Sequence, residues 1–143
     1  MRGSDKQGPS IAPSDMCFGC GRKNPCGVKL TFDWDGTVAR SEFTPTDMHQ
    51  GWQNIIHGGI LTTLLDEAMA YAAYFENVPG VTAVMDVKFR RPVKVGEHLT
   101  ISAWTTRKER RFAETRAKLT LDDGTVVTEA RATQYISEKG YRF

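Results

Sequence analysis

The most continuous apolar pattern in the chain runs from Gly58 or Gly59 to about Asn77. A helix drawn over this segment is apolar around most of its circumference, because its apolar residues are Ile60, Leu61, Leu64, Leu65, Ala68, Met69, Ala72, Ala73 and Phe75. Helices of this kind are buried in a core and do not lie on a surface. Pro79 and Gly80 follow and provide a stop signal. The pattern therefore predicts one long buried helix in the middle of the chain.

Alternation with a period of two replaces this pattern on both sides of the predicted helix. Residues 28–34 and 37–43 alternate, and Asp35-Gly36 between them is typical of a two-residue hairpin turn. Further strands are expected over residues 81–91, from residue 99 to a turn at 108–110, from 113 to 121, and over 125–136. The connections between the last four strands are short, which favours antiparallel pairing. Residues 44–56 form a long loop, and long loops in small domains are often functional.

An antiparallel sheet of about six strands and one apolar helix can bury their apolar surfaces together when the sheet wraps around the helix. The predicted fold class is therefore α+β with a hotdog fold, in which one long central helix fills the concave face of the sheet. We expect residues 1–16 to form a flexible lead-in, residues 17–137 the domain, and residues 138–143 a C-terminal tail.

The composition of the 143 residues is that of one globular domain, with 40% hydrophobic and 25% charged residues. A net charge of +2 gives no reason to expect a nucleic-acid or membrane partner. The first sixteen residues are polar and contain two prolines, so a secretory signal is not expected. The odd number of cysteines, three, argues against a closed disulfide framework and favours a reducing compartment. We therefore expect a cytoplasmic protein.

The three cysteines lie in a segment that is rich in turn residues, with Cys17 and Cys20 in C-x-x-C spacing and Cys26 shortly after them. This spacing fits a zinc site completed by a distant residue such as His49, but a second C-x-x-C or C-x-x-H is missing. The simplest interpretation is a glycine-rich structural loop with free thiols and no metal, and a redox pair is a third interpretation.

The candidate chemistry lies at the start and in the middle of the predicted helix. His57, Gly58 and Gly59 precede or open it, and Asp66 and Glu67 follow about two turns later. Free N–H groups at a helix start favour negative charge, and glycine lets a ligand approach the backbone closely. The structural alternative is that the glycines only turn the chain and the two acids form a solvated stripe. Against this alternative, an apolar helix has little reason to carry two adjacent acids, since burying an unpaired charge is costly.

The string HGGILTTLLDEA at residues 57–68 and the strand VTAVMDVKFRRPVKVGE at residues 81–97 carry a resemblance to a known family. Together they resemble the PaaI-like hotdog thioesterases, which hydrolyse acyl-coenzyme A thioesters. The resemblance covers roughly residues 17–137. The opening CFGCGRKNPCGVKLTF at residues 17–32 resembles the start of an uncharacterised branch of the same family.

The resemblance implies a catalytic role for five positions. Asp66 matches the acid that acts as general base or nucleophile. Gly58 or Gly59 matches the backbone N–H that polarises the thioester carbonyl, and His57 matches the adjacent orienting residue. Thr82 matches a small hydroxyl that holds the attacking water. The resemblance also implies two sites per homodimer, each formed by the acid helix of one subunit and the HGG segment of the other.

One departure from the family concerns the contact with the thioester. Many relatives carry Asn or Gln six residues before the histidine, where this chain has Gly51. The nearby amide of Gln50 or Asn54 is expected to replace the missing one. The basic residues Arg90 and Arg91 at the end of the third strand are expected either to bind coenzyme A phosphates or to form a solvated strand edge. The predicted substrate-binding residues are Gln50, Asn54, Glu67, Arg90 and Arg91.

The expected function is hydrolysis of an acyl-CoA thioester, without a cofactor because coenzyme A is part of the substrate. A non-catalytic acyl-CoA-binding module is the alternative from another functional class. A hotdog hydratase or dehydratase is a further alternative, although its GDxNPxH-type segment is missing. We expect a homodimer that pairs again into a homotetramer.

Overall fold

The computed structural model describes residues 12–136. Residues 1–11 and 137–143, which include most of the predicted lead-in and the C-terminal tail, lie outside the described part. The described elements follow the expected β-β-loop-α-β-β-β-β order. They are β1 (Asp33–Trp34), β2 (Val38–Phe43), the 3-10 helix η1 (Asp47–His49), α1 (Gly58–Phe75), β3 (Val81–Phe89), β4 (Leu99–Lys108), β5 (Phe112–Thr120) and β6 (Val126–Tyr135).

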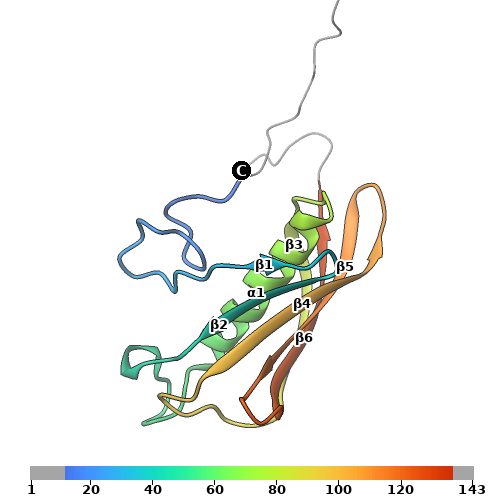
Figure 1. Cartoon of the computed structure of the whole chain (residues 1–143). Helices are drawn as coiled ribbons and strands as arrows, with labels where there is room; N and C mark the ends of the chain where they lie inside the picture. The colour runs from blue at the N-terminus through green and yellow to red at the C-terminus, as the bar shows by residue number, and fades with distance from the viewer. Residues whose placement is uncertain (1–11, 137–143) are drawn as a thin grey trace, which may run out of the picture.

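The strands form one antiparallel sheet of six strands, and α1 lies along one of its faces (Figure 1). The helix contacts β2, β3, β4, β5 and β6. The predicted hotdog architecture, a sheet around one long helix, is confirmed.

The core forms because the helix and the inner face of the sheet bring their apolar side chains together. On α1 the buried residues are Leu61, Leu64, Leu65, Ala68, Met69, Ala72 and Ala73. On the sheet, the alternating positions that the sequence placed on one face are buried, including Leu99, Ile101 and Ala103 on β4 and Ala113, Thr115, Ala117 and Leu119 on β5. The period-two pattern therefore identified the inner face of these strands correctly.

The strand order in space is β1-β2-β4-β5-β6-β3, which the sequence pattern did not predict. Strand β3 does not pair with β4, the next strand in the chain, but with β6, and it forms one edge of the sheet. The connection over residues 90–98 therefore crosses from one side of the sheet to the other. It is anchored near the helix start, where Ile56 N–H donates to Val93 O at 2.8 Å and Val93 is buried. This crossing places β3 alongside α1.

The first hairpin is confirmed, but its first strand is much shorter than the predicted range of residues 28–34. Gly36 adopts a positive φ of 96°, but the turn is shifted by one residue from the predicted Asp35-Gly36. Trp34 pairs with Ala39 and Asp35 N–H donates to Val38 O at 3.3 Å, so the central residues of the turn are Gly36 and Thr37. Lys29, however, has a φ of 58°, which interrupts the extended backbone. Val28 and Leu30 donate their N–H groups to Phe18 and Gly19 of the cysteine segment, so they do not pair with β2.

The cysteine segment folds into a compact loop that begins before the predicted domain boundary at residue 17. Cys17 N–H donates to Ser14 O at 3.0 Å, and Lys23 N–H donates to Asp15 O at 2.9 Å. Residues 14–16 are therefore part of the loop and not of a separate lead-in. We call residues 14–27 the cysteine loop.

None of the helices within residues 12–136 combines the length and the apolar character that crossing a bilayer requires.

Candidate active site

The start of α1 is capped by His57. The Gly59 N–H donates to His57 Nδ1 at 2.8 Å, and the Ile60 and Leu61 N–H groups point to the His57 carbonyl oxygen. Because Nδ1 accepts a hydrogen bond, the neutral ring carries its proton on Nε2. His57 therefore has a definite local role, since it satisfies a backbone donor that the helix leaves open.

The two glycines are not equivalent. The Gly59 N–H is engaged by His57, whereas the Gly58 N–H has no acceptor among residues 12–136. A methyl group at Gly58 would lie 3.5 Å from the Phe89 ring, an ordinary contact, but a methyl group at Gly59 would lie 2.9 Å from His57 Nδ1. Of the two candidate donors, Gly58 is thus the one that remains available to a ligand.

Asp66 lies half-buried on α1 and faces the first residues of β3. The Thr82 hydroxyl lies 2.6 Å from Asp66 Oδ1 and 3.2 Å from Gln134 Oε1. The Thr82 hydroxyl has one proton to donate, and it donates it to the closer, charged carboxylate of Asp66. The structure therefore brings together Asp66 and Thr82, two residues that the sequence placed in the same site.

Gln134 is a member of this site that the sequence analysis missed. Its side chain is fully buried on β6, and its Nε2 atom has no partner among the described residues. Both Gln134 and Thr82 are satisfied when the amide presents its NH₂ group to the Thr82 oxygen. The alternation of β6 could have revealed it. Thr128, Ala130, Ala132 and Gln134 share the inner face of this strand, and a buried amide on that face needs a hydrogen-bond partner.

The helix start and the acid do not meet within one chain. Gly58 and Asp66 are eight residues apart on the same helix, which corresponds to about 12 Å along its axis. A single thioester group cannot contact both at hydrogen-bond distance.

Glu67 lies beside Asp66 in sequence but faces a different neighbour. Its carboxylate oxygens lie 3.6 and 3.8 Å from Cys17 Sγ, and the Gly19 backbone lies directly against it. Burial and the adjacent Glu67 carboxylate raise the pKa of the Cys20 thiol to about 12. Cys17, Cys20 and Glu67 therefore form a cluster, whereas Cys26 is exposed and lies outside it.

The loop before the helix uses the amide of Gln50 for its own structure. Gln50 Nε2 donates to Asp47 O at 2.8 Å, and its Oε1 accepts from Asn54 N–H at 2.6 Å. Asn54 occupies a turn with a φ of 62°. Both ends of the Gln50 side chain are thus engaged within the loop, and a contact of Gln50 with substrate would require these bonds to break.

His49, the residue suggested above as a possible zinc ligand, is held in the same loop. Its Nδ1 accepts from Thr46 N–H at 2.9 Å, and its ring packs against Phe43.

Arg90 and Arg91 directly follow Phe89, whose ring lies near Gly58. Each is paired with an acid on the protein surface, Arg90 with Glu129 at 2.6 Å and Arg91 with Glu97 at 3.0 Å. These two predicted residues therefore follow in sequence the residue that contacts Gly58, and part of their charge is already balanced by the two acids.

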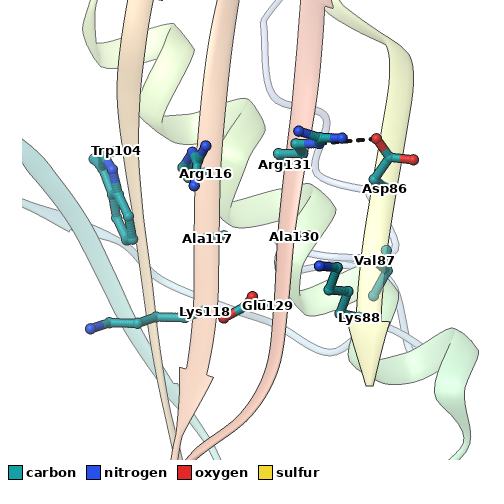
Figure 2. Close-up of a pocket in the computed structure, with 10 residues that line it drawn as sticks. All are labelled: Asp86, Val87, Lys88, Trp104, Arg116, Ala117, Lys118, Glu129, Ala130 and Arg131. Carbon is teal, nitrogen blue, oxygen red and sulfur yellow. Dashed lines mark hydrogen bonds and ion pairs between the residues drawn. The ribbon is translucent and has the colours of Figure 1, made fainter. Parts of the chain in front are cut away.

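A separate groove of about 400 Å³ lies on the sheet and contains none of the predicted site residues. Figure 2 shows its charged side chains on neighbouring strands: Asp86, Lys88, Arg116, Lys118, Glu129 and Arg131. The register aligns Trp104, Arg116, Arg131 and Asp86 in one row across β4, β5, β6 and β3. Asp66 is not part of this surface.

Comparison with known proteins finds curated relatives. The chain is 37% identical over 79 residues to an uncharacterised protein of Schizosaccharomyces pombe, covering 54% of this chain and 45% of that protein. It is 26% identical over 98 residues to acyl-coenzyme A thioesterase 13 of Mus musculus, covering 66% of this chain and 70% of that protein. The match thus spans less than half the length of the first relative.

Solved structures share the fold. The E. coli PaaI protein from the phenylacetic acid degradation operon superposes with a TM-score of 0.71 at 22% identity, covering 76% of this chain and 83% of that chain. A hypothetical thioesterase from Streptococcus pneumoniae, solved with coenzyme A, superposes with a TM-score of 0.72 at 18% identity, covering 78% and 88%. The family model described as thioesterase superfamily matches residues 53–128, which is more than half of the chain. The chain therefore belongs to the thioesterase superfamily.

Proposed function

We propose that this protein hydrolyses an acyl-coenzyme A thioester to a carboxylic acid and free coenzyme A. The observation that carries the proposal is the half-buried carboxylate of Asp66 on a helix that buries seven apolar side chains, with the Thr82 hydroxyl 2.6 Å from Asp66 Oδ1. Membership of the thioesterase superfamily supports this reaction class.

In the proposed reaction, water attacks the thioester carbon while Asp66 accepts a proton from that water. Thr82 donates to Oδ1, so Oδ2 is left to act as the base. The Thr82 oxygen can accept the second hydrogen of the same water. When the carbon–sulfur bond breaks, the proton passes to the sulfur of coenzyme A, and Asp66 returns to its ionised form.

The Gly58 N–H is the proposed donor to the thioester oxygen as negative charge develops on it. It lies at a helix start, where the macrodipole favours negative charge, and no Cβ prevents close approach. Arg90 and Arg91, which follow the strand end beside Gly58, are positioned to attract the coenzyme A phosphates. The fold shared with a structure that contains coenzyme A is consistent with such a ligand.

The separation of about 12 Å between Gly58 and Asp66 supports a site shared between two copies of the chain. Strand β3 offers the surface for such a pairing, because it is an edge strand of nine residues with no neighbour on its outer side within the described chain. Val81, Val84 and Phe89 are exposed along it. Long apolar edges of this kind are normally covered. We therefore propose a homodimer in which the Gly58 N–H of one subunit faces Asp66 of the other.

Replacing Asp66 with Asn keeps the shape of the side chain and removes the base. We expect kcat for acyl-CoA hydrolysis to fall about 10²- to 10⁴-fold. The rate of free thiol release from a panel of acyl-CoA esters measures kcat. Asp33→Asn on the exposed strand β1 is the matched control. Equal activity of Asp66→Asn and Asp33→Asn would exclude Asp66 as the base. If the wild type binds acyl-CoA but releases no thiol from any ester, the protein is a binding module and not an enzyme.

Thr82→Val removes the hydroxyl with little change in volume. A hydrogen bond to a charged group contributes about 1.5–3 kcal/mol, so kcat should fall roughly 10- to 100-fold. Thr82→Ser keeps a hydroxyl and should retain most of the activity. An active Thr82→Val variant would show that the contact with Asp66 serves only packing.

Gly58→Ala and Gly59→Ala should fail in different ways. The methyl group at Gly58 meets only an ordinary contact, so melting temperature should be equal or higher while kcat falls about 10²- to 10³-fold through loss of the oxyanion donor. The methyl group at Gly59 should displace His57 and lower the free energy of unfolding by about 1 kcal/mol, the usual value of a cap. Thermal melts and steady-state kinetics on both variants check this. A Gly58→Ala variant with unchanged turnover would contradict the role given to its N–H.

Val84→Lys places a charge on the exposed edge of β3. We expect light scattering to show a mass of two chains, or of four if dimers pair again, for the wild type, and a single-chain mass with little activity for the variant. Thr37→Lys adds the same charge in the β1–β2 turn and should remain dimeric and active. A wild type that is active as a monomer would rule out the shared site.

A further inference from the structure

We propose that Cys17, Cys20 and Glu67 form a binding site for a zinc ion, which fastens the cysteine loop to α1. This inference is independent of the proposed hydrolase activity. It rests on one side-chain cluster that joins two distant parts of the chain.

The donor atoms already lie close to the geometry of a zinc site. Three donor atoms lie within 4.8 Å of one another: the Sγ atoms of Cys17 and Cys20 and one carboxylate oxygen of Glu67. Tetrahedral zinc with ordinary bond lengths separates a sulfur ligand from an oxygen ligand by about 3.5 Å. The observed distance from Cys17 Sγ to the nearer Glu67 oxygen is 3.6 Å. Small side-chain movements are therefore enough to bring the donors around one ion.

The backbone around the donors is tightly constrained. A Cβ at Gly19 would lie 2.6 Å from the Glu67 carboxylate, and a Cβ at Gly21 would collide with the Cys17 backbone nitrogen. Gly21 N–H also donates to Cys17 O at 2.8 Å, which closes the turn between the two cysteines. The sequence Cys-Phe-Gly-Cys-Gly thus provides two sulfurs on a fixed turn, in which Gly19 leaves room for the Glu67 carboxylate and Gly21 lets the backbone pass close to Cys17.

The charge of the cluster also fits a cation. Two thiolates and a carboxylate are a soft and anionic donor set, the type that selects zinc over magnesium or calcium. Within residues 12–136, no lysine, arginine or histidine forms an ion pair with Glu67. A divalent ion supplies the positive charge that the protein does not, and the two thiol protons pass to solvent when it binds.

The cluster is open to solvent on one side. The three donors line a depression of about 260 Å³ together with Ala70, Tyr71 and Tyr74 of α1. Water can reach an ion bound there and complete its tetrahedron. Cys26 is exposed and outside the cluster, so it is the natural control.

The test uses the full chain purified under reducing conditions without a metal-affinity tag. Elemental analysis after gel filtration should find about one zinc per chain in the wild type and in Cys26→Ser, and less than a tenth of that in Cys17→Ser and Cys20→Ser. After chelator treatment, the wild type should bind cobalt and show a near-ultraviolet absorption band from thiolate-to-cobalt charge transfer. Added zinc should raise the melting temperature of the wild type and Cys26→Ser only.

Glu67→Gln tests the third ligand and should weaken zinc binding at least about 10-fold, whereas Glu76→Gln, just past the end of α1, should not. The proposal is overturned if the folded, reduced wild type binds neither zinc nor cobalt, as it would if the two cysteines served only as a redox pair. It is also overturned if Cys17→Ser and Cys20→Ser bind metal as well as Cys26→Ser does, or if Glu67→Gln binds as tightly as Glu76→Gln. Since metal content is measured directly, an inactive enzyme does not affect the result.

Discussion

The burial of α1 against the sheet is the constraint on which the rest of the structure depends. Seven of its eighteen residues are buried and form one stripe along the helix, so polar side chains are confined to the rest of its surface. Asp66 and Glu67 both lie outside the buried stripe, and adjacent helix positions point about 100° apart. Asp66 therefore faces β3 and bonds Thr82, while Glu67 faces the cysteine loop and contacts Cys17. Two neighbouring acids acquire different environments from one packing arrangement.

The same constraint explains why one chain holds only parts of the proposed site. The helix is straight and rigid, so its first N–H and its acid are kept about 12 Å apart whatever the side chains do. In the proposed homodimer a second copy completes the site, and the strand order places the edge strand β3 beside the acid. A two-fold axis at that edge would make the two sites equivalent, since a self-complementary surface contributes the same residues twice.

Much of this arrangement could be predicted from the sequence because it follows from local rules. The apolar circumference of residues 60–75 gave the buried helix, and alternation gave the inner faces of β4 and β5. Non-local contacts could not be predicted in this way. No local pattern indicates that β3 pairs with β6 or that Val28 and Leu30 donate hydrogen bonds to the cysteine loop. The contact between Gln134 and Thr82 is equally non-local. The unequal roles of Gly58 and Gly59 were equally hidden, because they depend on the rotamer of His57.

The cysteine loop shows how a three-dimensional contact changes the interpretation of a motif. In sequence, Cys17 and Cys20 lack a further pair of ligands, so free thiols are the simplest interpretation. The fold supplies a third donor from a residue about fifty positions away, and that residue is the neighbour of the proposed catalytic acid. A carboxylate held by a zinc ion cannot also act as a mobile base or as a substrate contact. If the loop fixes Glu67 in this way, the helix presents a single reactive acid to the thioester, and the loop restricts rotation of α1 at the position where Asp66 must meet Thr82.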